Sequence, residues 1–97
     1  QGEIINIGGY KVSPIEVEQA ARGVPGIADC VLVAAQLPLG TVLKLIYTSD
    51  SGQPLDHRVV ARQLAAQLER YKVPMCYEHV ASLHYTFNGK VDRKAYR

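Results

Sequence analysis

The sequence predicts an α+β fold, with a small antiparallel sheet of about three strands and two main helices packed on one face of it. Three observations lead to this prediction. Two segments repeat apolar residues at helical spacing, three others are strand-like, and they follow one another as helix, strand, strand, helix, strand. A two-stranded N-terminal hairpin is expected to precede them. The 97 residues, 47% of them hydrophobic, are enough for one domain with a single modest core.

Residues 3–12 are expected to form the hairpin, because two short apolar pieces flank Gly8-Gly9. Glycine adopts positive φ without steric cost, so the pair suits the tip of a tight turn. A second interpretation is that the missing β-carbons let another molecule approach the backbone closely. The residues alone favour the first interpretation.

The first helix has strong start signals. Ser13 is expected to cap it, Pro14 fits its first position and Glu16 completes a capping box. Glu18 and Arg22 are predicted to pair across one turn on the outer face, which gives Glu18 a structural rather than a catalytic role. The apolar positions recur at the spacing of a core-facing stripe: Val17, Ala20, Ala21 and Val24.

The remaining elements follow in order. Residues 27–35 are nearly all apolar, which is typical of a strand covered on both faces. Residues 42–48 form a second strand with one apolar face, and the short connection predicts that the two strands pair antiparallel. Asp56 is expected to cap a second helix that ends near residue 70, and residues 77–83 are a third, poorer strand. The apolar stripe of the second helix is Val60, Leu64, Leu68 and Tyr71.

Several kinds of site are not expected. The net charge of +2 is too small to indicate a nucleic-acid partner, and no apolar run is long enough to span a bilayer. Neither the cysteines nor the histidines have metal-ligand spacing, so no metal site is predicted. Cys30 lies in an apolar run and is expected to be a small buried residue. Without a disulfide framework, the sequence fits a reducing cytoplasm.

The most distinctive stretch carries a turn followed by a lysine. Asn88-Gly89 is a turn dipeptide, because both residues tolerate positive φ, and a turn here would lift Lys90 away from the domain. An ammonium with three donors suits a phosphate or carboxylate oxygen. Taken alone, such a stretch is more often a solvated turn with a basic tail. It reads Thr86-Phe87-Asn88-Gly89-Lys90-Val91-Asp92-Arg93-Lys94.

Two stretches in the right order together resemble the small C-terminal domain of the adenylate-forming enzymes. This family holds acyl- and aryl-CoA synthetases, peptide-synthetase adenylation domains and luciferases. The second stretch is Asn88 to Lys94, and the first reads Ile4-Ile5-Asn6-Ile7-Gly8-Gly9-Tyr10-Lys11-Val12-Ser13-Pro14-Ile15-Glu16-Val17-Glu18. The resemblance covers essentially the whole chain. It implies that residues 1–97 are a mobile lid domain, a fragment that begins at the interdomain hinge and lacks the large N-terminal domain.

The resemblance implies an acid–thiol ligase activity that needs both domains, so the isolated chain is not expected to be active. The N-terminal domain would bind ATP, Mg²⁺ and a carboxylic acid, and Lys90 would stabilise the charge that builds up as acyl-AMP and pyrophosphate form. After the lid rotates, coenzyme A would enter through a pantetheine tunnel and accept the acyl group as a thioester. The implied tunnel loop is Gly8, Gly9, Tyr10 and Lys11, and the implied supports of the lysine loop are Thr86, Asn88 and Gly89.

The chain departs from the family pattern at three places. The hinge aspartate and the acid after it align with Gly2 and Glu3, and glycine suits a hinge because it absorbs large changes of φ and ψ. Prolines are common where this chain has His84 and Phe87, so the Lys90 loop is expected to be less rigid or differently shaped. The Gly-Arg usually found just upstream of the hinge lies outside this chain.

Three alternatives stay open at this point. The wording of the first motif favours a CoA synthetase over a peptide-synthetase adenylation domain or another carrier-protein ligase. A non-enzymatic binding module would instead use the basic C-terminus, formed by Lys90, Arg93, Lys94 and Arg97. Lys90 is also a candidate for acetylation, as in some relatives, which would neutralise its charge. The expected partners are the chain's own N-terminal domain, ATP, the acid and coenzyme A; the identity of the acid is not encoded here.

Overall fold

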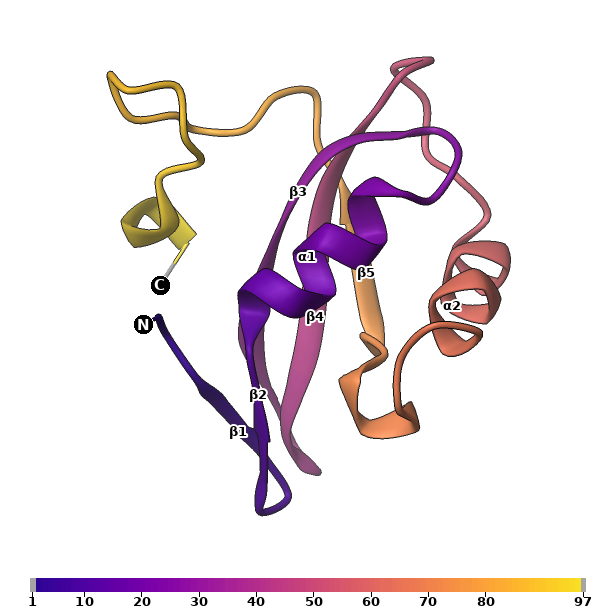
Figure 1. Cartoon of the computed structure of the whole chain (residues 1–97), viewed down its shortest axis with the longest axis vertical. Helices are drawn as coiled ribbons and strands as arrows, with labels where there is room; N and C mark the ends of the chain where they lie inside the picture. The colour runs from indigo at the N-terminus through magenta and orange to yellow at the C-terminus, as the bar shows by residue number, and fades with distance from the viewer. Residues whose placement is uncertain (1, 97) are drawn as a thin grey trace.

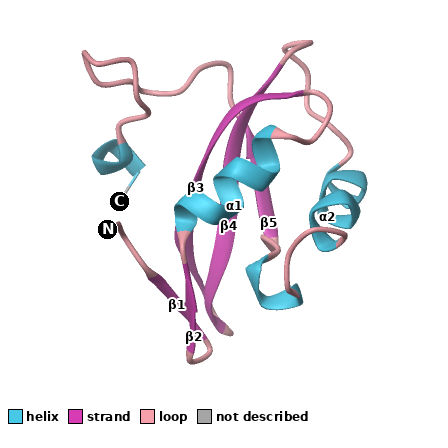
Figure 2. Ribbon diagram, viewed as in Figure 1, coloured by secondary structure: helices cyan, strands magenta, loops and turns pink. Residues whose placement is uncertain are grey.

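A computed structural model describes residues 2–96 of the chain, and it confirms an α+β fold with one hairpin, one three-stranded sheet and two α-helices (Figures 1 and 2). In chain order the elements are β1 (Ile5–Ile7), β2 (Tyr10–Val12), α1 (Pro14–Arg22), β3 (Ile27–Leu37), β4 (Gly40–Ser49), α2 (His57–Ala65), the short 3-10 helix η1 (Arg70–Lys72), β5 (Cys76–His79) and a second 3-10 helix, η2 (Arg93–Tyr96).

The main sheet has the order β3-β4-β5, and only its first pair of strands is antiparallel. Strand β5 runs parallel to β4, with Leu45 opposite Tyr77, so the prediction of an all-antiparallel sheet was wrong. The reason is the connection. Helix α2 carries the chain back along the sheet before β5 begins, and a strand entered after such a crossover runs parallel to its neighbour. Strand β5 is also shorter than predicted, because the chain leaves the sheet after His79.

Both helices pack on one face of the main sheet, as predicted. The shared core draws on both helices and the two long strands: Val17, Ala21, Cys30, Leu32, Leu43, Leu45, Tyr47, Val60 and Leu64. Successive residues of a strand point to opposite faces, so Val31 and Ile46 project the other way and join Leu83 in a smaller cluster. The centre of β3 is therefore covered on both faces, which confirms that prediction. Part of this second cover comes from the C-terminal segment, through Val91 and Tyr96.

The N-terminal hairpin confirms the turn predicted at its glycines. Ile5 pairs with Val12 across the hairpin, and both side chains are buried in the core. Gly8 and Gly9 at the tip have φ of 55° and 91°, the type I′ geometry of two-residue hairpins. A β-carbon on either glycine would meet nothing within 4 Å among residues 2–96, so backbone conformation rather than packing within this domain requires them.

The helix starts agree with the sequence at α2 and differ from it at α1. Asp56 caps α2 by accepting a hydrogen bond of 3.0 Å from the backbone N–H two residues on. Pro14 is the first residue of α1 as predicted, but Ser13 makes no side-chain cap and the predicted capping box does not form. Glu16 instead reaches the ammonium of Lys72 at 3.0 Å, because a full positive charge competes well with a backbone N–H.

Helix α2 ends at Ala65, earlier than predicted, although its apolar stripe continues beyond it. Val60 and Leu64 are buried within the helix, whereas Leu68 and Tyr71 are partly buried in the turns that follow. The spacing of apolar residues alone predicts one continuous helix here, because it does not separate a helix from successive turns that bury the same side chains.

Glu18 is not the outward-facing partner of Arg22 that the sequence predicts. Its side chain is buried, with 1% of the residue exposed, and its two carboxylate oxygens contact the guanidinium of Arg93. One of these oxygens also accepts a hydrogen bond of 2.7 Å from the Leu32 backbone N–H. Arg22 turns instead to Asp29, at 3.0 Å. Position 18 lies on the buried side of α1, so its carboxylate needs charged and hydrogen-bonding partners inside the fold.

Replacing Glu18 by Ala should destabilise this chain by about 3 kcal/mol, because it leaves Arg93 and a backbone N–H without their buried partner. Denaturant unfolding measures the loss. Glu16→Ala is the matched control: it removes an exposed ion pair from the same helix and should cost at most about 1 kcal/mol. Equal losses for the two variants would contradict the role given to Glu18.

Candidate functional site

The stretch around Lys90 folds into a short turn closed by its own backbone, as the sequence predicts. Tyr85 and Val91 form an antiparallel bridge. Within it the Thr86 N–H donates to the Lys90 carbonyl at 2.7 Å, and the Gly89 N–H donates to the Thr86 carbonyl at 2.9 Å. Gly89 has φ of 84°, whereas in the described residues no side-chain-bearing position has a positive φ. The turn therefore uses the conformational freedom of glycine and not that of the preceding asparagine.

Lys90 lies exposed on this turn, and its ammonium has no ion pair or hydrogen bond with any of residues 2–96. The turn belongs to a C-terminal arm that leaves the sheet and lies on the side of the molecule away from α2 (Figure 1). Phe87, at the tip, is 100% exposed. An ammonium without a partner on a projecting turn is available to an anion outside this domain.

The positions where the family commonly has proline are His84 and Phe87, and the turn closes without either proline. The His84 N–H donates to the Tyr96 hydroxyl at 2.9 Å, which a proline could not do. The Asp92 N–H donates to the His84 carbonyl at 2.8 Å. His84 thus ties the start of the arm to η2 by hydrogen bonds.

Asp29 contacts the arm from the start of β3. Its carboxylate accepts hydrogen bonds from the Tyr85 hydroxyl at 2.7 Å, from Arg22 Nε at 3.0 Å and from the Cys30 N–H at 2.8 Å. Burial raises the pKa of Asp29, but these hydrogen bonds outweigh it and hold the pKa below its ordinary value. The same hydrogen bond to Asp29 raises the pKa of Tyr85. At neutral pH the pair is therefore a carboxylate and a protonated hydroxyl.

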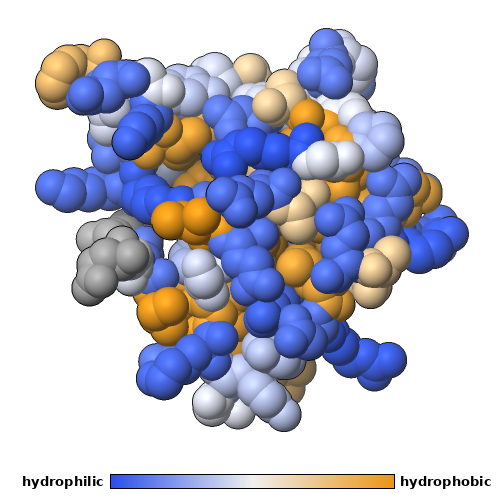
Figure 3. Space-filling model, viewed as in Figure 1, coloured by the Kyte–Doolittle hydropathy of each residue, from blue (hydrophilic) through white to orange (hydrophobic). Residues whose placement is uncertain are grey.

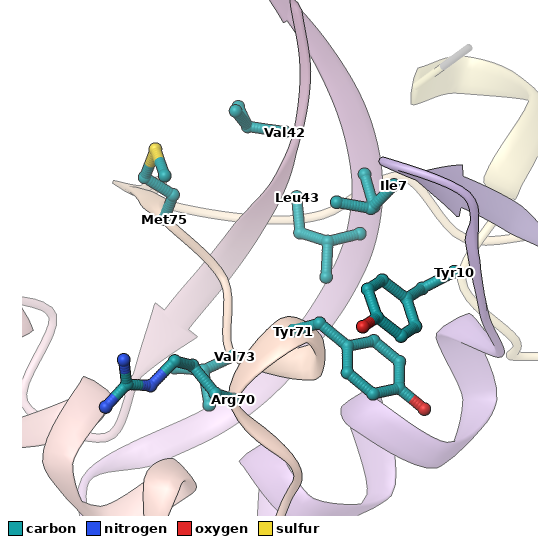
Figure 4. Close-up of a pocket in the computed structure, with 8 residues that line it drawn as sticks. All are labelled: Ile7, Tyr10, Val42, Leu43, Arg70, Tyr71, Val73 and Met75. Atoms are coloured by element: carbon teal, nitrogen blue, oxygen red, sulfur yellow. The ribbon is translucent and has the colours of Figure 1, made fainter.

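The predicted tunnel loop, Gly8 to Lys11, lies far from the Lys90 turn. In Figure 1 the hairpin tip is at the bottom of the molecule and the C-terminal arm is at the top, along an axis of 34 Å. Tyr10 stacks on Tyr71 of η1, with ring centroids 4.2 Å apart, beside an apolar cavity of about 440 Å³ (Figure 4). The figure shows Ile7 and Leu43 on the same side of this cavity as the two rings. The structure does not bring the two predicted site segments together.

The structure describes Lys90, Arg93 and Lys94 of the basic C-terminal cluster. Arg93 turns inward to Glu18, and Arg97 lies outside the described residues. Lys90 and Lys94 stay exposed. The face seen in Figure 3 is mostly hydrophilic, with small apolar patches between the polar side chains. Lys90 and Lys94 nevertheless border one hollow together with Arg93.

Gly2 and Glu3, the predicted hinge, lie before β1 and outside any regular element. A β-carbon at Gly2 would meet Ile15 at an ordinary contact distance of 3.6 Å. Packing against the described residues therefore does not itself require glycine at this position. Glu3 lines a hollow shared with Arg93 and Tyr96, so the start of the chain lies beside the end of the C-terminal arm.

The other sequence expectations concern cysteines, metals and membranes. Cys30 is fully buried, and burial raises the pKa of its thiol to about 12, which makes it an inert core residue as predicted. Cys76 is also a free thiol. Residues 2–96 hold no group of three His, Cys, Asp or Glu side chains placed to bind a metal ion. Within the same residues, every helix is too short or too polar to cross a bilayer.

Comparison with known proteins identifies relatives of this chain. No family model matches the chain. A 2-succinylbenzoate–CoA ligase from Staphylococcus aureus is 36% identical to it over 97 residues, an alignment that covers 98% of this chain and 19% of that protein. The chain is a homologue of the acyl- and aryl-CoA synthetases.

Solved structures of CoA synthetases share the fold of this chain. The anthranilate CoA ligase AuaEII, in complex with anthranoyl-AMP, superimposes with a TM-score of 0.88 at 24% identity, over 97% of this chain and 19% of its own. ATP-bound MatB from Rhodopseudomonas palustris gives a TM-score of 0.85 at 24% identity, with the same coverage. The chain thus spans about a fifth of the length of the proteins it matches.

The sequence analysis did not predict the two polar contacts beneath the Lys90 turn, Glu18 with Arg93 and Asp29 with Tyr85. One signal was present for Glu18. With Pro14, Val17 and Ala21 it completes the spacing of a buried helical face, which marks the position as core even though the residue is charged. No local pattern marks Asp29 and Tyr85 as partners, because 56 positions separate them.

Replacing Asp29 by Asn should cost stability only where the carboxyl group is ionised. Because the folded-state pKa is lowered, the contribution is fully present above the unfolded value of about 3.9 and is lost as the pH falls through the folded-state pKa. The loss in unfolding free energy should therefore be present at neutral pH and shrink as the pH falls below about 5 and through the lowered folded-state pKa.

Denaturant unfolding across this pH range measures the effect of Asp29→Asn. Asp50→Asn is the matched control, because Asp50 is exposed and its side chain has no ion pair or hydrogen bond within residues 2–96. A loss for Asp29→Asn that stays constant into acid would contradict the carboxylate role.

Proposed function

We propose that this chain is the mobile C-terminal domain of an ATP-dependent carboxylate–CoA ligase. The full-length enzyme first joins a carboxylic acid to AMP with release of pyrophosphate, and then transfers the acyl group to the thiol of coenzyme A. The observation that carries the proposal is the alignment of the whole chain with one fifth of a 2-succinylbenzoate–CoA ligase. The complexes of AuaEII with anthranoyl-AMP and of MatB with ATP support the use of ATP and an acyl adenylate.

Lys90 is the residue that we assign to the adenylation step. The substrate carboxylate and the α-phosphate repel each other, and negative charge grows on the phosphoryl oxygens as pyrophosphate leaves. A positioned ammonium offsets both effects, and in a site without water this kind of stabilisation is strong. The exposure of Lys90 and the lack of a partner for its ammonium within residues 2–96 support this role.

The hairpin tip is assigned to the thioester step. Gly8 and Gly9 present bare backbone at the end of the domain away from Lys90 (Figure 1), so a rotation of the whole domain would exchange one segment for the other at the reacting centre. Tyr10 and Lys11 follow on the same loop and would border the pantetheine tunnel. Gly2 and Glu3 are the proposed hinge of this rotation.

The remaining groups are assigned to the rest of the enzyme. ATP, Mg²⁺ and the acid would be held mainly by the large N-terminal domain, and coenzyme A would be shared between the domains. Magnesium would supply charge neutralisation on the phosphates. The two free thiols of the chain support a reducing, cytoplasmic location. The alternative is a ligase that transfers the acyl group to a carrier protein. Such an enzyme would form no thioester when coenzyme A is supplied in place of the carrier protein.

Lys90→Ala in the full-length enzyme should lower pyrophosphate exchange by about 10²- to 10³-fold, the usual cost of losing one electrostatic stabiliser. Thioester formation from supplied acyl adenylate should be retained, because that step uses the other end of the domain. Lys94→Ala, which changes a neighbouring exposed lysine, is the control and should leave both steps unchanged. Unchanged exchange in Lys90→Ala would remove Lys90 from the mechanism.

Gly8→Asn should lower thioester formation by about tenfold while leaving adenylation intact, because it adds a side chain to the tunnel loop. Asparagine is the informative choice, since it tolerates the φ of 55° found at Gly8 and is favoured at this position of a type I′ turn. A larger residue at Gly9, with φ of 91°, would strain the turn and confuse the result. Equal loss of both steps in Gly8→Asn would argue that the glycine is only structural.

A further inference from the structure

The Lys90 turn has little apolar support of its own. Residues 84–90 are all exposed, and the nearest buried side chain in the arm is Leu83. Val91 and Tyr96 pack against the small second cluster but are themselves only partly buried. A loop that must place an ammonium accurately therefore depends on polar contacts with the body of the domain.

Two polar side-chain contacts join the described part of the arm to α1 and β3, and one lies on each side of the turn. Before it, the Tyr85 hydroxyl donates to Asp29 at 2.7 Å. After it, Arg93 contacts both carboxylate oxygens of Glu18, with its Nη1 at 2.8 Å from one of them. Lys90 lies between these two anchors in the sequence, five residues after the first and three before the second.

Both anchoring carboxylates are themselves held in place. Glu18 is buried and accepts the Leu32 N–H in addition to Arg93. Asp29 is fixed through one oxygen by Arg22 and the Cys30 N–H, which leaves its other oxygen for Tyr85. Each anchor is thus tied to the rigid α1–β3 unit and not to another mobile loop.

The anchors and the lysine also share one surface. A hollow of about 410 Å³ between α1 and the turn is lined by Glu18, Asp29, Lys90 and Arg93, among others. The fork of Arg93 is engaged by Glu18, whereas the ammonium of Lys90 has no acidic partner within residues 2–96. The acids beneath the turn therefore hold its flanks and leave the lysine itself unpaired.

We infer that Glu18 and Asp29 are positioning residues for Lys90, acting through Arg93 and Tyr85 to hold both flanks of the turn. This inference rests on the proposed function of Lys90. A displacement of about 1 Å in a reacting group can cost about a hundredfold in rate, so two anchors on either side of the lysine bear directly on adenylation. The hairpin tip shares neither anchor, and the thioester step should not depend on them.

The test uses the full-length enzyme with Tyr85→Phe and Arg93→Ala. Tyr85→Phe should lower kcat for adenylation about tenfold and Arg93→Ala about a hundredfold, with smaller changes in KM. Arg93→Lys should recover part of the loss, because it keeps the charge but not the two-pronged contact. Thioester formation from supplied acyl adenylate should be unchanged in all three. Glu16→Gln, on the same helix but paired with Lys72, is the control and should affect neither step.

A double mutant separates positioning from general stability. If Tyr85 acts through the lysine, Tyr85→Phe should cause no further loss of adenylation in a Lys90→Ala background. A further loss there, an equal loss of both half-reactions, or unchanged adenylation in both Tyr85→Phe and Arg93→Ala would overturn the inference. Tyr85→Phe keeps the test valid if Arg93→Ala fails to fold. Unchanged adenylation in Lys90→Ala alone would instead refute the proposed function.

Discussion

The burial of one carboxylate organises much of this domain. Glu18 is removed from water, so it needs a cation and donors inside the fold, and it finds them 75 positions away in Arg93 and 14 positions away in the Leu32 N–H. This contact joins helix α1, strand β3 and the C-terminal arm at one point. Among the described residues, the apolar cluster beneath the arm has only three buried members, so a polar anchor is needed to fix the position of the arm.

The two segments proposed to act in catalysis are supported by different forces. The glycine hairpin is held by apolar burial of Ile5 and Val12 and by the stacking of Tyr10 on Tyr71. The Lys90 turn is held by charged and hydrogen-bonded contacts at its flanks. Because neither support includes the other segment, each can meet a different partner surface without rearrangement inside the domain. This independence suits a rigid lid that rotates as a unit between two reactions.

Much of the fold follows from local chemistry. The alternation of apolar residues in β4, the cap at Asp56 and the two glycines at the hairpin tip each depend on neighbours in the sequence, and each was predicted. The direction of β5 was not, because it depends on which strand β5 joins after the α2 crossover, and a weak strand of four residues does not show that neighbour. The missing cap at Ser13 has a similar cause, since the partner that diverts Glu16 is Lys72, 56 positions away.

The sequence by itself determined the class of fold, the order of its elements, the family resemblance and the turn that presents Lys90. These features rest on short-range rules of spacing, capping and backbone freedom, which are legible in neighbouring residues. The tertiary structure alone decided that Glu18 is buried, that Asp29 meets Tyr85 and that the hairpin and the lysine turn lie at opposite ends of the molecule. A charged residue shows in sequence only that it needs a partner, and the packing of distant segments selects which one it finds.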